Sequence, residues 1–235
     1  MGFGPKLILF DIDGTLVLTG GAGLRAMIRA GEEVFGVGNG FERVPMNGRT
    51  DAWIVAQMAA GHGLTCDARA LGRFREIYVK HLSAEVHLPG PRKGVMPGVR
   101  PLLDALSGRS DVYLALLTGN FEAGARIKLE YFDLWRYFRC GAFGDDAHDR
   151  NALLEAALRR VHEGGGPTIA ASDVVIVGDT PLDVAVAIAG GTRSVAVATG
   201  SHDVEALLAS GADVVLEDLS EVPVALEALG LAPTG

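Results

Sequence analysis

Leu7-Ile8-Leu9-Phe10-Asp11-Ile12-Asp13-Gly14-Thr15 is the stretch that decides the fold of this chain. Its first four residues form a short apolar run, which predicts a strand buried on both faces of a sheet. The run ends at two aspartates, spaced i and i+2, and then at a glycine. Aspartate is seldom buried without a partner, so this pair indicates a hard cation together with a carboxylate nucleophile or acid/base. The alternative is a turn in which Asp and Gly only end the strand.

The composition of the 235-residue chain is that of an ordinary globular protein, with 49% hydrophobic and 21% charged residues. The length suits one core domain with a smaller second domain. The formal net charge of −8, without a long Lys/Arg block, argues against nucleic acid or an anionic membrane as a partner. We find no signal peptide and no apolar stretch that approaches a membrane span, and we expect a cytoplasmic protein.

Four further β-type runs and the helical patterns between them define the rest of the fold. The predicted strands are Val112–Leu117, Val174–Val177, Ser194–Ala198 and Val214–Leu216. The predicted helices are Asn120–Tyr131, Asn151–Val161, Leu182–Ala189 and Asp203–Leu208. Alternating strands and helices at this spacing predict an α/β protein with a Rossmann-like, doubly wound parallel sheet. Such folds place their sites at the carboxyl ends of the strands.

The region from residue 17 to residue 93 has a different pattern. It contains three predicted helices and no clear strand; the helices are Gly23–Phe35, Asp51–Ala60 and Arg69–His81. Turn-rich joints bound the region on both sides. We expect residues 1–16 and 94–235 to form the α/β core domain and residues 17–93 to form a helical cap hinged over the strand ends. The alternative is a helical layer packed permanently on the sheet.

Three of the predicted strands end in polar groups that can do chemistry together. After Asp11 and Asp13, the second strand runs into Thr118-Gly119-Asn120 and the third into Gly178-Asp179-Thr180-Pro181-Leu182-Asp183. These ends lie along one edge of a parallel sheet. Two or three carboxylates with water suit Mg²⁺. A hydroxyl and free N–H groups at a helix start suit a phosphate oxygen. A basic side chain is also needed to balance the negative charge.

The segments DIDGT, LLTGN and GDTPLD resemble motifs I, II and IV of the haloacid dehalogenase superfamily. The likeness covers essentially the whole chain, because that superfamily inserts its helical cap after motif I. Within the superfamily the chain is similar to the phosphoglycolate phosphatase and β-phosphoglucomutase branch. The resemblance implies Mg²⁺-dependent hydrolysis of a small phosphorylated metabolite through an aspartyl-phosphate. Monomer and homodimer both remain open.

The resemblance also implies roles for individual residues. Asp11 would be the nucleophile, and Asp13 would protonate the leaving alkoxide and then deprotonate water. The Mg²⁺ ligands would be Asp11, the backbone carbonyl of Asp13 and Asp179, with Asp183 supporting the metal. The phosphate-binding residues would be Thr15, Thr118, Gly119 and Asn120.

Asp13 distinguishes between the reactions of the superfamily. Dehalogenating relatives lack an acid at this second position, because a halide leaving group needs no proton. An alkoxide leaving from phosphorus needs one. The presence of Asp13 therefore favours a phosphatase over a dehalogenase.

Motif III is where this sequence departs from the family pattern. Relatives usually show a lysine at the start of the helix before motif IV, but residues 144–151 here read GDDAHDRN. We assign the role to Arg150, since a guanidinium can bridge a carboxylate and a phosphate. Lys128, on the helix after Thr118, is the rival, against the alternative that it lies on a solvated helix face. Arg49 lies at a turn-to-helix junction of the predicted cap, where relatives place residues that read the substrate; the alternative is a solvated loop arginine.

Two other functions remain alternatives. A β-phosphoglucomutase-like phosphotransferase would use the same core residues but keep the intermediate long enough to phosphorylate a sugar. A phosphate-binding scaffold that has lost catalysis is supported only by the missing motif III lysine.

Overall fold

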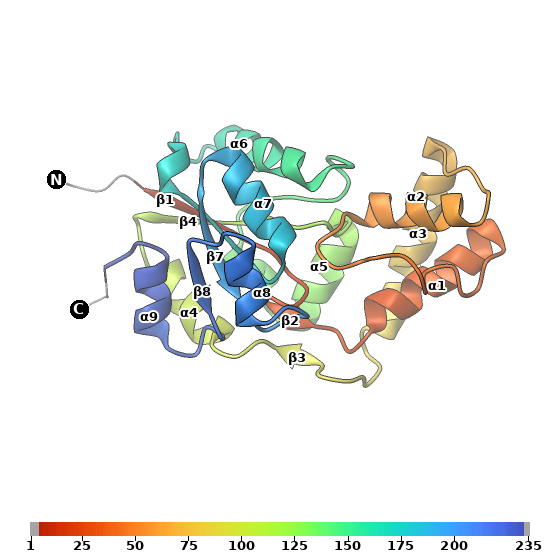
Figure 1. Ribbon diagram of the computed structural model, residues 1–235, viewed down its shortest axis with the longest axis horizontal. Coiled ribbons are helices and arrows are strands. Elements are labelled where there is room, and N and C mark those ends of the chain that lie inside the picture. Colours follow the sequence, from red (N-terminus) through yellow and green to blue (C-terminus); the bar gives the residue numbers. More distant parts are fainter. Residues whose placement is uncertain (1–4, 233–235) are drawn as a thin grey trace.

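The computed structural model describes residues 5–232, which form a six-stranded parallel sheet covered by helices and a helical cluster beside it (Figure 1). The strand order is β5-β4-β1-β6-β7-β8. The strands are β1 (Lys6–Phe10), β4 (Val112–Leu117), β5 (Gly141–Ala142), β6 (Val174–Gly178), β7 (Arg193–Val197) and β8 (Val214–Leu216). This architecture confirms the predicted Rossmann-like α/β fold.

The central strand β1 supplies side chains to both faces of the sheet. Ile8 and Phe10 belong to one hydrophobic cluster, whereas Leu7 and Leu9 belong to the other. Successive residues of a strand point to opposite faces, so a continuously apolar strand needs cover on both. One face is covered by α4 (Val99–Ser107), α5 (Glu122–Tyr131) and α9 (Val222–Ala228), and the other by α6 (Leu153–Glu163) and α7 (Pro181–Gly190). The short helix α8 (Val204–Ala209) packs its Leu207 against Val184 and Ala196.

The site follows from the position of β1 in the sheet. From β1 the chain continues to β4 on one side and later to β6 on the other, so the strand order reverses there. Phe10 is paired with Leu116 of β4 and with Val177 of β6. The residues just beyond these three positions therefore emerge next to one another, at the crevice where doubly wound sheets bind ligands.

The helical cluster consists of α1 (Ala22–Phe35), α2 (Asp51–Gly61) and α3 (Ala68–Glu85), which lie to one side of the sheet in Figure 1. It has a hydrophobic cluster of its own, which includes Met27, Phe74 and Tyr78. Phe121, from the loop before α5, also packs into this cluster. The two chain segments that join the helices to the sheet pair as a short antiparallel ribbon of β2 (Val17–Leu18) and β3 (Gly94–Val95). The partition into a core and a cap remains a prediction, and residues 1–4 and 233–235 of the predicted core lie outside the described residues.

Several element boundaries differ from the prediction. Strands β2, β3 and β5 have two residues each, too few to give a hydrophobic pattern, so the expectation of no strand in residues 17–93 was wrong at Val17 and Leu18. The helix predicted from Asn120 begins at Glu122, because the Asn120 side chain bonds to neighbouring side chains instead of capping the helix. The helix predicted from Asn151 begins as a 3₁₀ turn, Arg150–Ala152, before α6. Within residues 5–232, no helix is long and apolar enough to cross a membrane.

Candidate active site

A cavity of about 300 Å³ lies at the carboxyl ends of β1, β4 and β6, beneath the helical cluster. The sheet side contributes Asp11, Asp13 and Thr118 to its wall, and the helical side contributes Arg49 and Tyr78. The three strand ends that the sequence predicted to converge therefore meet in one cavity.

Three buried carboxylates are gathered at the sheet side of this cavity. Asp11, Asp179 and Asp183 each offer an oxygen, and these oxygens lie within 4.8 Å of one another. Burial, together with the charges of the neighbouring carboxylates, raises the pKa of Asp11 to about 6 and the pKa of Asp179 well above its ordinary value, although the charge of Arg150 opposes both shifts. Such a group is stable in its ionised form only beside positive charge.

The backbone leaves room for this carboxylate cluster. A Cβ atom at Gly14 or at Gly200 would overlap the Asp179 side chain. Thr15 donates a hydrogen bond to Asp179 Oδ1 at 3.3 Å. Three oxygen ligands in a buried cluster are the donor set of a hard divalent cation such as Mg²⁺. The residues present thus fit the metal that the sequence motifs imply.

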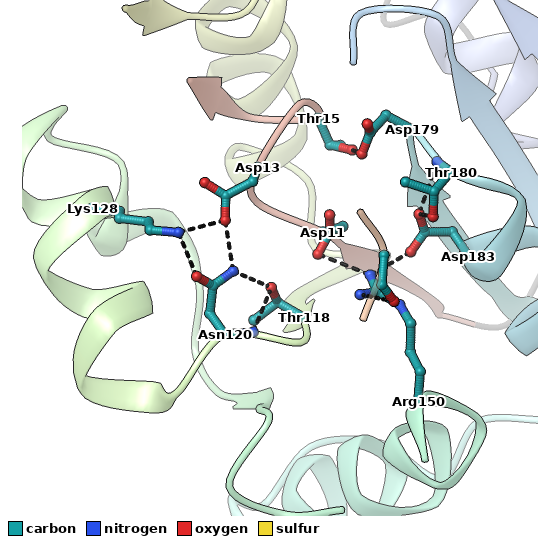
Figure 2. Close-up of polar contacts among 11 residues, drawn as sticks. Asp11, Asp13, Thr15, Thr118, Asn120, Lys128, Arg150, Asp179, Thr180 and Asp183 are labelled. Atoms are coloured by element: carbon teal, nitrogen blue, oxygen red, sulfur yellow. Dashed lines mark hydrogen bonds and ion pairs between the residues drawn. The ribbon is translucent and has the colours of Figure 1, made fainter. Parts of the chain in front are cut away.

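Arg150 supplies positive charge to the same carboxylates (Figure 2). Its Nη2 atom lies 2.9 Å from Asp11 Oδ1 and 2.5 Å from Asp183 Oδ1, and both carboxylates raise the pKa of the guanidinium. Its Nη1 atom donates to the Gly48 carbonyl at 3.0 Å. The buried Nε–H has no partner among the described residues. Arg150 therefore places its charge against Asp11 and Asp183, and its assignment to motif III remains a prediction.

Lys128 faces the second acid instead. Its Nζ atom lies 2.5 Å from both Asp13 Oδ2 and Asn120 Oδ1 (Figure 2). The Asn120 amide donates in turn to Asp13 Oδ2 and to Thr118 Oγ1, each at 2.8 Å. Because the Lys128 ammonium can only donate, the Asn120 side-chain oxygen must face it, and the Asn120 nitrogen must face the two acceptors. Lys128 is 4% exposed, so the alternative of a solvated helix face was wrong.

Asp183 is held in place by the start of helix α7. Its Oδ2 atom accepts from the Thr180 backbone N–H at 3.1 Å and from the Thr180 hydroxyl at 2.8 Å. This is a capping box, with Pro181 in the first turn of the helix. The sequence T-P-L-D carries this signal, since a Thr followed three residues later by an acid marks a helix start. The other Asp183 oxygen is left free to contact Arg150.

The loop before α2 brings the helical cluster onto the strand ends. The Asp51 N–H donates to the Gly119 carbonyl at 2.7 Å, and the Phe121 N–H donates to Asp51 Oδ2 at 2.8 Å. A Cβ atom at Gly119 would overlap the backbone of Arg49, so the two segments touch directly. The Arg49 guanidinium lies 4.5 Å from the centre of the Trp53 ring. Arg49 is also among the residues that line the cavity, and its role in reading the substrate remains a prediction.

One predicted phosphate-binding residue lies elsewhere. Thr15 is fully buried behind Asp179 and is not among the residues of the described chain that line the cavity. Its hydroxyl instead donates a hydrogen bond to Asp179 in the carboxylate cluster. Thr118, Gly119 and Asn120 do line the cavity, next to Asp11.

Sequence reasoning missed two buried polar residues of the cavity wall, Asp51 and Tyr78. Burial raises the pKa of Asp51 to about 7, although the charge of Lys128 and the bond from Phe121 oppose the rise. In the sequence, Asp51 is an ordinary acid in the first turn of a helix, and Tyr78 belongs to the apolar face of another. No local sequence pattern distinguishes these two residues from an acid or a tyrosine with a purely structural role, because their burial depends on which loop packs against them.

Comparisons with known proteins give one family and one fold. Residues 5–191 match the model of the haloacid dehalogenase-like hydrolases. The phosphoglycolate phosphatase of Rhodospirillum rubrum is 30% identical over 230 residues, which cover 93% of this chain and 89% of that protein. A hydrolase from Pseudomonas syringae shares the fold with a TM-score of 0.69 and 20% identity, over 97% of this chain and 100% of the other. A structure described as a β-phosphoglucomutase from Thermotoga maritima superimposes with a TM-score of 0.59 and 22% identity, over 94% and 98% of the two chains.

Proposed function

Since the chain belongs to the haloacid dehalogenase-like hydrolases, with relatives that are named phosphatases, we propose that it is a Mg²⁺-dependent phosphomonoester hydrolase. One observation carries this proposal. Two acids from one strand end face the same cavity with different partners: Asp11 contacts Arg150, and Asp13 contacts Lys128. This separation suits a reaction that needs a nucleophile and a proton donor.

In the first step, an Asp11 carboxylate oxygen attacks phosphorus in line with the ester bond. A bond forms between the carboxylate oxygen and phosphorus, the ester bond breaks, and Asp13 gives its proton to the departing alkoxide. Arg150 holds Asp11 Oδ1 at 2.9 Å and so fixes which way the carboxylate points. The product of this step is an aspartyl-phosphate and a free alcohol.

In the second step, Asp13 takes a proton from a water molecule, whose oxygen attacks the phosphorus of the aspartyl-phosphate. The bond to Asp11 breaks, inorganic phosphate leaves, and both carboxyl groups return to their starting states. The Thr118 hydroxyl accepts from Asn120, and its hydrogen bond with Asp11 lowers the pKa of that carboxyl, so the hydroxyl lies beside the nucleophile. From there it would donate to a phosphoryl oxygen, beside the Gly119 N–H. These donors stabilise the charge on the phosphoryl oxygens during both steps.

Asp11, the Asp13 carbonyl and Asp179 would hold Mg²⁺, with Asp183 in support. When bound, the ion neutralises the crowded carboxylates and the phosphoryl group. A cavity of about 300 Å³ is at the small end of ligand sites, which suits a small phosphorylated metabolite. The helical cap over the strand ends excludes bulk water from the aspartyl-phosphate.

The test is the release of inorganic phosphate from p-nitrophenyl phosphate by the wild type and by Asp11→Asn, with Mg²⁺ or EDTA. We expect hydrolysis by the wild type, its loss in EDTA and its recovery with excess Mg²⁺. Asp11→Asn should lose activity by at least about 10³-fold, because the amide oxygen is a poor nucleophile. Activity that survives Asp11→Asn in clean protein would refute the nucleophile assignment. Turnover of a sugar phosphate without phosphate release would instead favour a phosphotransferase.

A further inference from the structure

The hydroxyl of Tyr78 is buried without a hydrogen-bond partner among the described residues. The side chain is 0% exposed, and its ring stacks on Phe74 and meets the edge of Phe121. These ring contacts fix where the hydroxyl lies. A buried polar group that lacks a partner is destabilising, so such a group in a native protein needs an explanation.

The Tyr78 hydroxyl lies at one end of the cavity. The helical cap and Lys128 form the walls of this end. A Cβ atom built on Gly23 would lie 3.8 Å from the Tyr78 hydroxyl and 3.6 Å from Lys128 Nζ. Both donors therefore border one small space beside helix α1, and all three residues line the cavity. Lys128 Nζ also contacts Asp13, the proposed proton donor. This space is consequently on the leaving-group side of the site.

The other residues around this space distinguish it from the phosphate end of the cavity. Met27 and Ile54 line the cavity and belong to the same hydrophobic cluster as Tyr78, so its walls near this residue are apolar. Burial, together with the charges of Asp51 and Asp13, raises the pKa of Tyr78 well above its ordinary value. The hydroxyl thus keeps its proton at neutral pH and can donate it to an oxygen.

We propose that Tyr78 is a specificity-determining residue, whose hydroxyl donates a hydrogen bond to a second oxygen carried by the leaving alcohol. The preferred substrates are then phosphomonoesters whose short leaving group bears a hydroxyl or carboxylate oxygen, with its carbon atoms against the apolar walls. A ligand of this kind gives the Tyr78 hydroxyl the partner that it lacks. This inference rests on the proposed phosphatase function and deepens it.

The experiment compares kcat/KM for three esters: ethyl phosphate, 2-hydroxyethyl phosphate and 2-phosphoglycolate. The first has no second oxygen, the second has a hydroxyl and the third a carboxylate. We expect the wild type to have a higher kcat/KM for at least one of the two oxygenated esters than for ethyl phosphate. Which of the two it prefers shows whether Tyr78 contacts a hydroxyl or a carboxylate. In Tyr78→Phe the ratio of kcat/KM for the preferred ester to that for ethyl phosphate should fall by about three- to tenfold if the second oxygen is a hydroxyl, the value of one neutral hydrogen bond, and by about ten- to hundredfold if it is a carboxylate.

Two further variants keep the result clear. Gly23→Ala fills the space between the two donors and should lower the same ratio, while alanine favours the helix. Tyr113→Phe removes a buried hydroxyl on the far side of the fold, near Cys140, and should leave the ratio unchanged. The melting temperature of Tyr78→Phe should not fall, because the hydroxyl has no protein partner to lose.

Three results would overturn the inference. The first is a wild type that hydrolyses all three esters without preference. The second is an unchanged ratio in both Tyr78→Phe and Gly23→Ala. The third is an equal loss on every ester in Tyr78→Phe with a lower melting temperature, which would assign the hydroxyl a structural role. If the wild type hydrolyses p-nitrophenyl phosphate with Mg²⁺ but none of the three esters, the inference alone fails. If it releases no phosphate from p-nitrophenyl phosphate either, the proposed function itself fails, and this inference fails with it.

Discussion

Replacing Arg150 with methionine tests whether this residue balances the charge of the carboxylate cluster. Methionine keeps much of the apolar stem but removes the contacts to Asp11, Asp183 and the Gly48 carbonyl. Removing one partner of a buried ion pair costs about 3–5 kcal/mol. For a chain of this size that corresponds to a fall in melting temperature of about 10 °C.

The loss of stability should depend on pH. A carboxyl group whose pKa is higher in the folded than in the unfolded protein destabilises the fold as pH rises toward the folded pKa. The pKa of Asp11 is about 6 even beside Arg150, and removing the guanidinium raises it further. Below about pH 5 Asp11 and Asp179 of the variant are mostly protonated, so the difference in stability between the two proteins should be smallest there. The difference should be largest at pH 7 to 8.

The assay is thermal unfolding of both proteins between pH 5 and pH 8, in EDTA and with Mg²⁺. Arg126→Met is the matched control, since Arg126 is exposed and pairs with Glu130 on the same helix. An exposed pair of this kind contributes about 0.3–0.5 kcal/mol, so the control should melt close to the wild type. Mg²⁺ should raise the melting temperature of Arg150→Met more than that of the wild type, because the ion replaces part of the missing charge.

Activity provides the second readout for Arg150. We expect kcat/KM to fall about 10²–10³-fold, the usual effect of removing one preorganised charge-stabilising group. Arg150→Lys should recover only part of the activity, since one ammonium cannot reproduce the guanidinium contacts to two carboxylates and a carbonyl. If Arg150→Met melts like the wild type at pH 7 in EDTA, our account of charge balance in this cluster is refuted.

Two further predictions concern the neighbouring charged residues. Because burial raises the pKa of Asp51 from 3.8 to about 7, wild-type stability should fall by up to about 4 kcal/mol from pH 4 to pH 7. Asp51→Asn keeps an acceptor for the Phe121 N–H and should lack this fall. Urea unfolding at pH 5 and pH 8 should therefore show that the variant is more stable than the wild type, by an amount that grows with pH. A gain in stability that does not depend on pH would contradict this prediction. Lys128→Met frees the Asp13 carboxylate and should lower kcat for ethyl phosphate about tenfold, with a smaller effect on p-nitrophenyl phosphate, whose leaving group needs little protonation. Exposed Lys80→Met serves as its control, and an equal loss on both esters would speak against a role through Asp13.

The parts of this protein that the sequence predicts well are those governed by local patterns. Continuous apolar runs at β1, β4 and β6 predicted a sheet covered on both faces, and parallel topology then required their polar ends to meet. The two-residue strands β2, β3 and β5 were missed because their pairing depends on the neighbouring segment.

The division of labour between the two cations needed the tertiary structure. The sequence offered Arg150 and Lys128 as rivals for one role, on helical segments whose orientation no pattern gives. In the fold, one faces Asp11 and the other faces Asp13, so each serves a different acid. The sequence alone could not show this, because an ion pair between residues more than 100 positions apart depends on how whole helices pack.

The sequence by itself determined the fold class and the acids at the strand ends. Both follow from residues that are close together in the sequence: the spacing of apolar residues and the polar residues that end each run. Only the tertiary structure decided which polar groups are buried and which have partners. Asp51 and Tyr78 are ordinary helix residues in the sequence, but the packing of the helical cluster against α5 makes them part of the cavity wall. Burial arises from segments that meet in space, and it is burial that gives a carboxyl or a hydroxyl an unusual pKa and an unmet hydrogen bond.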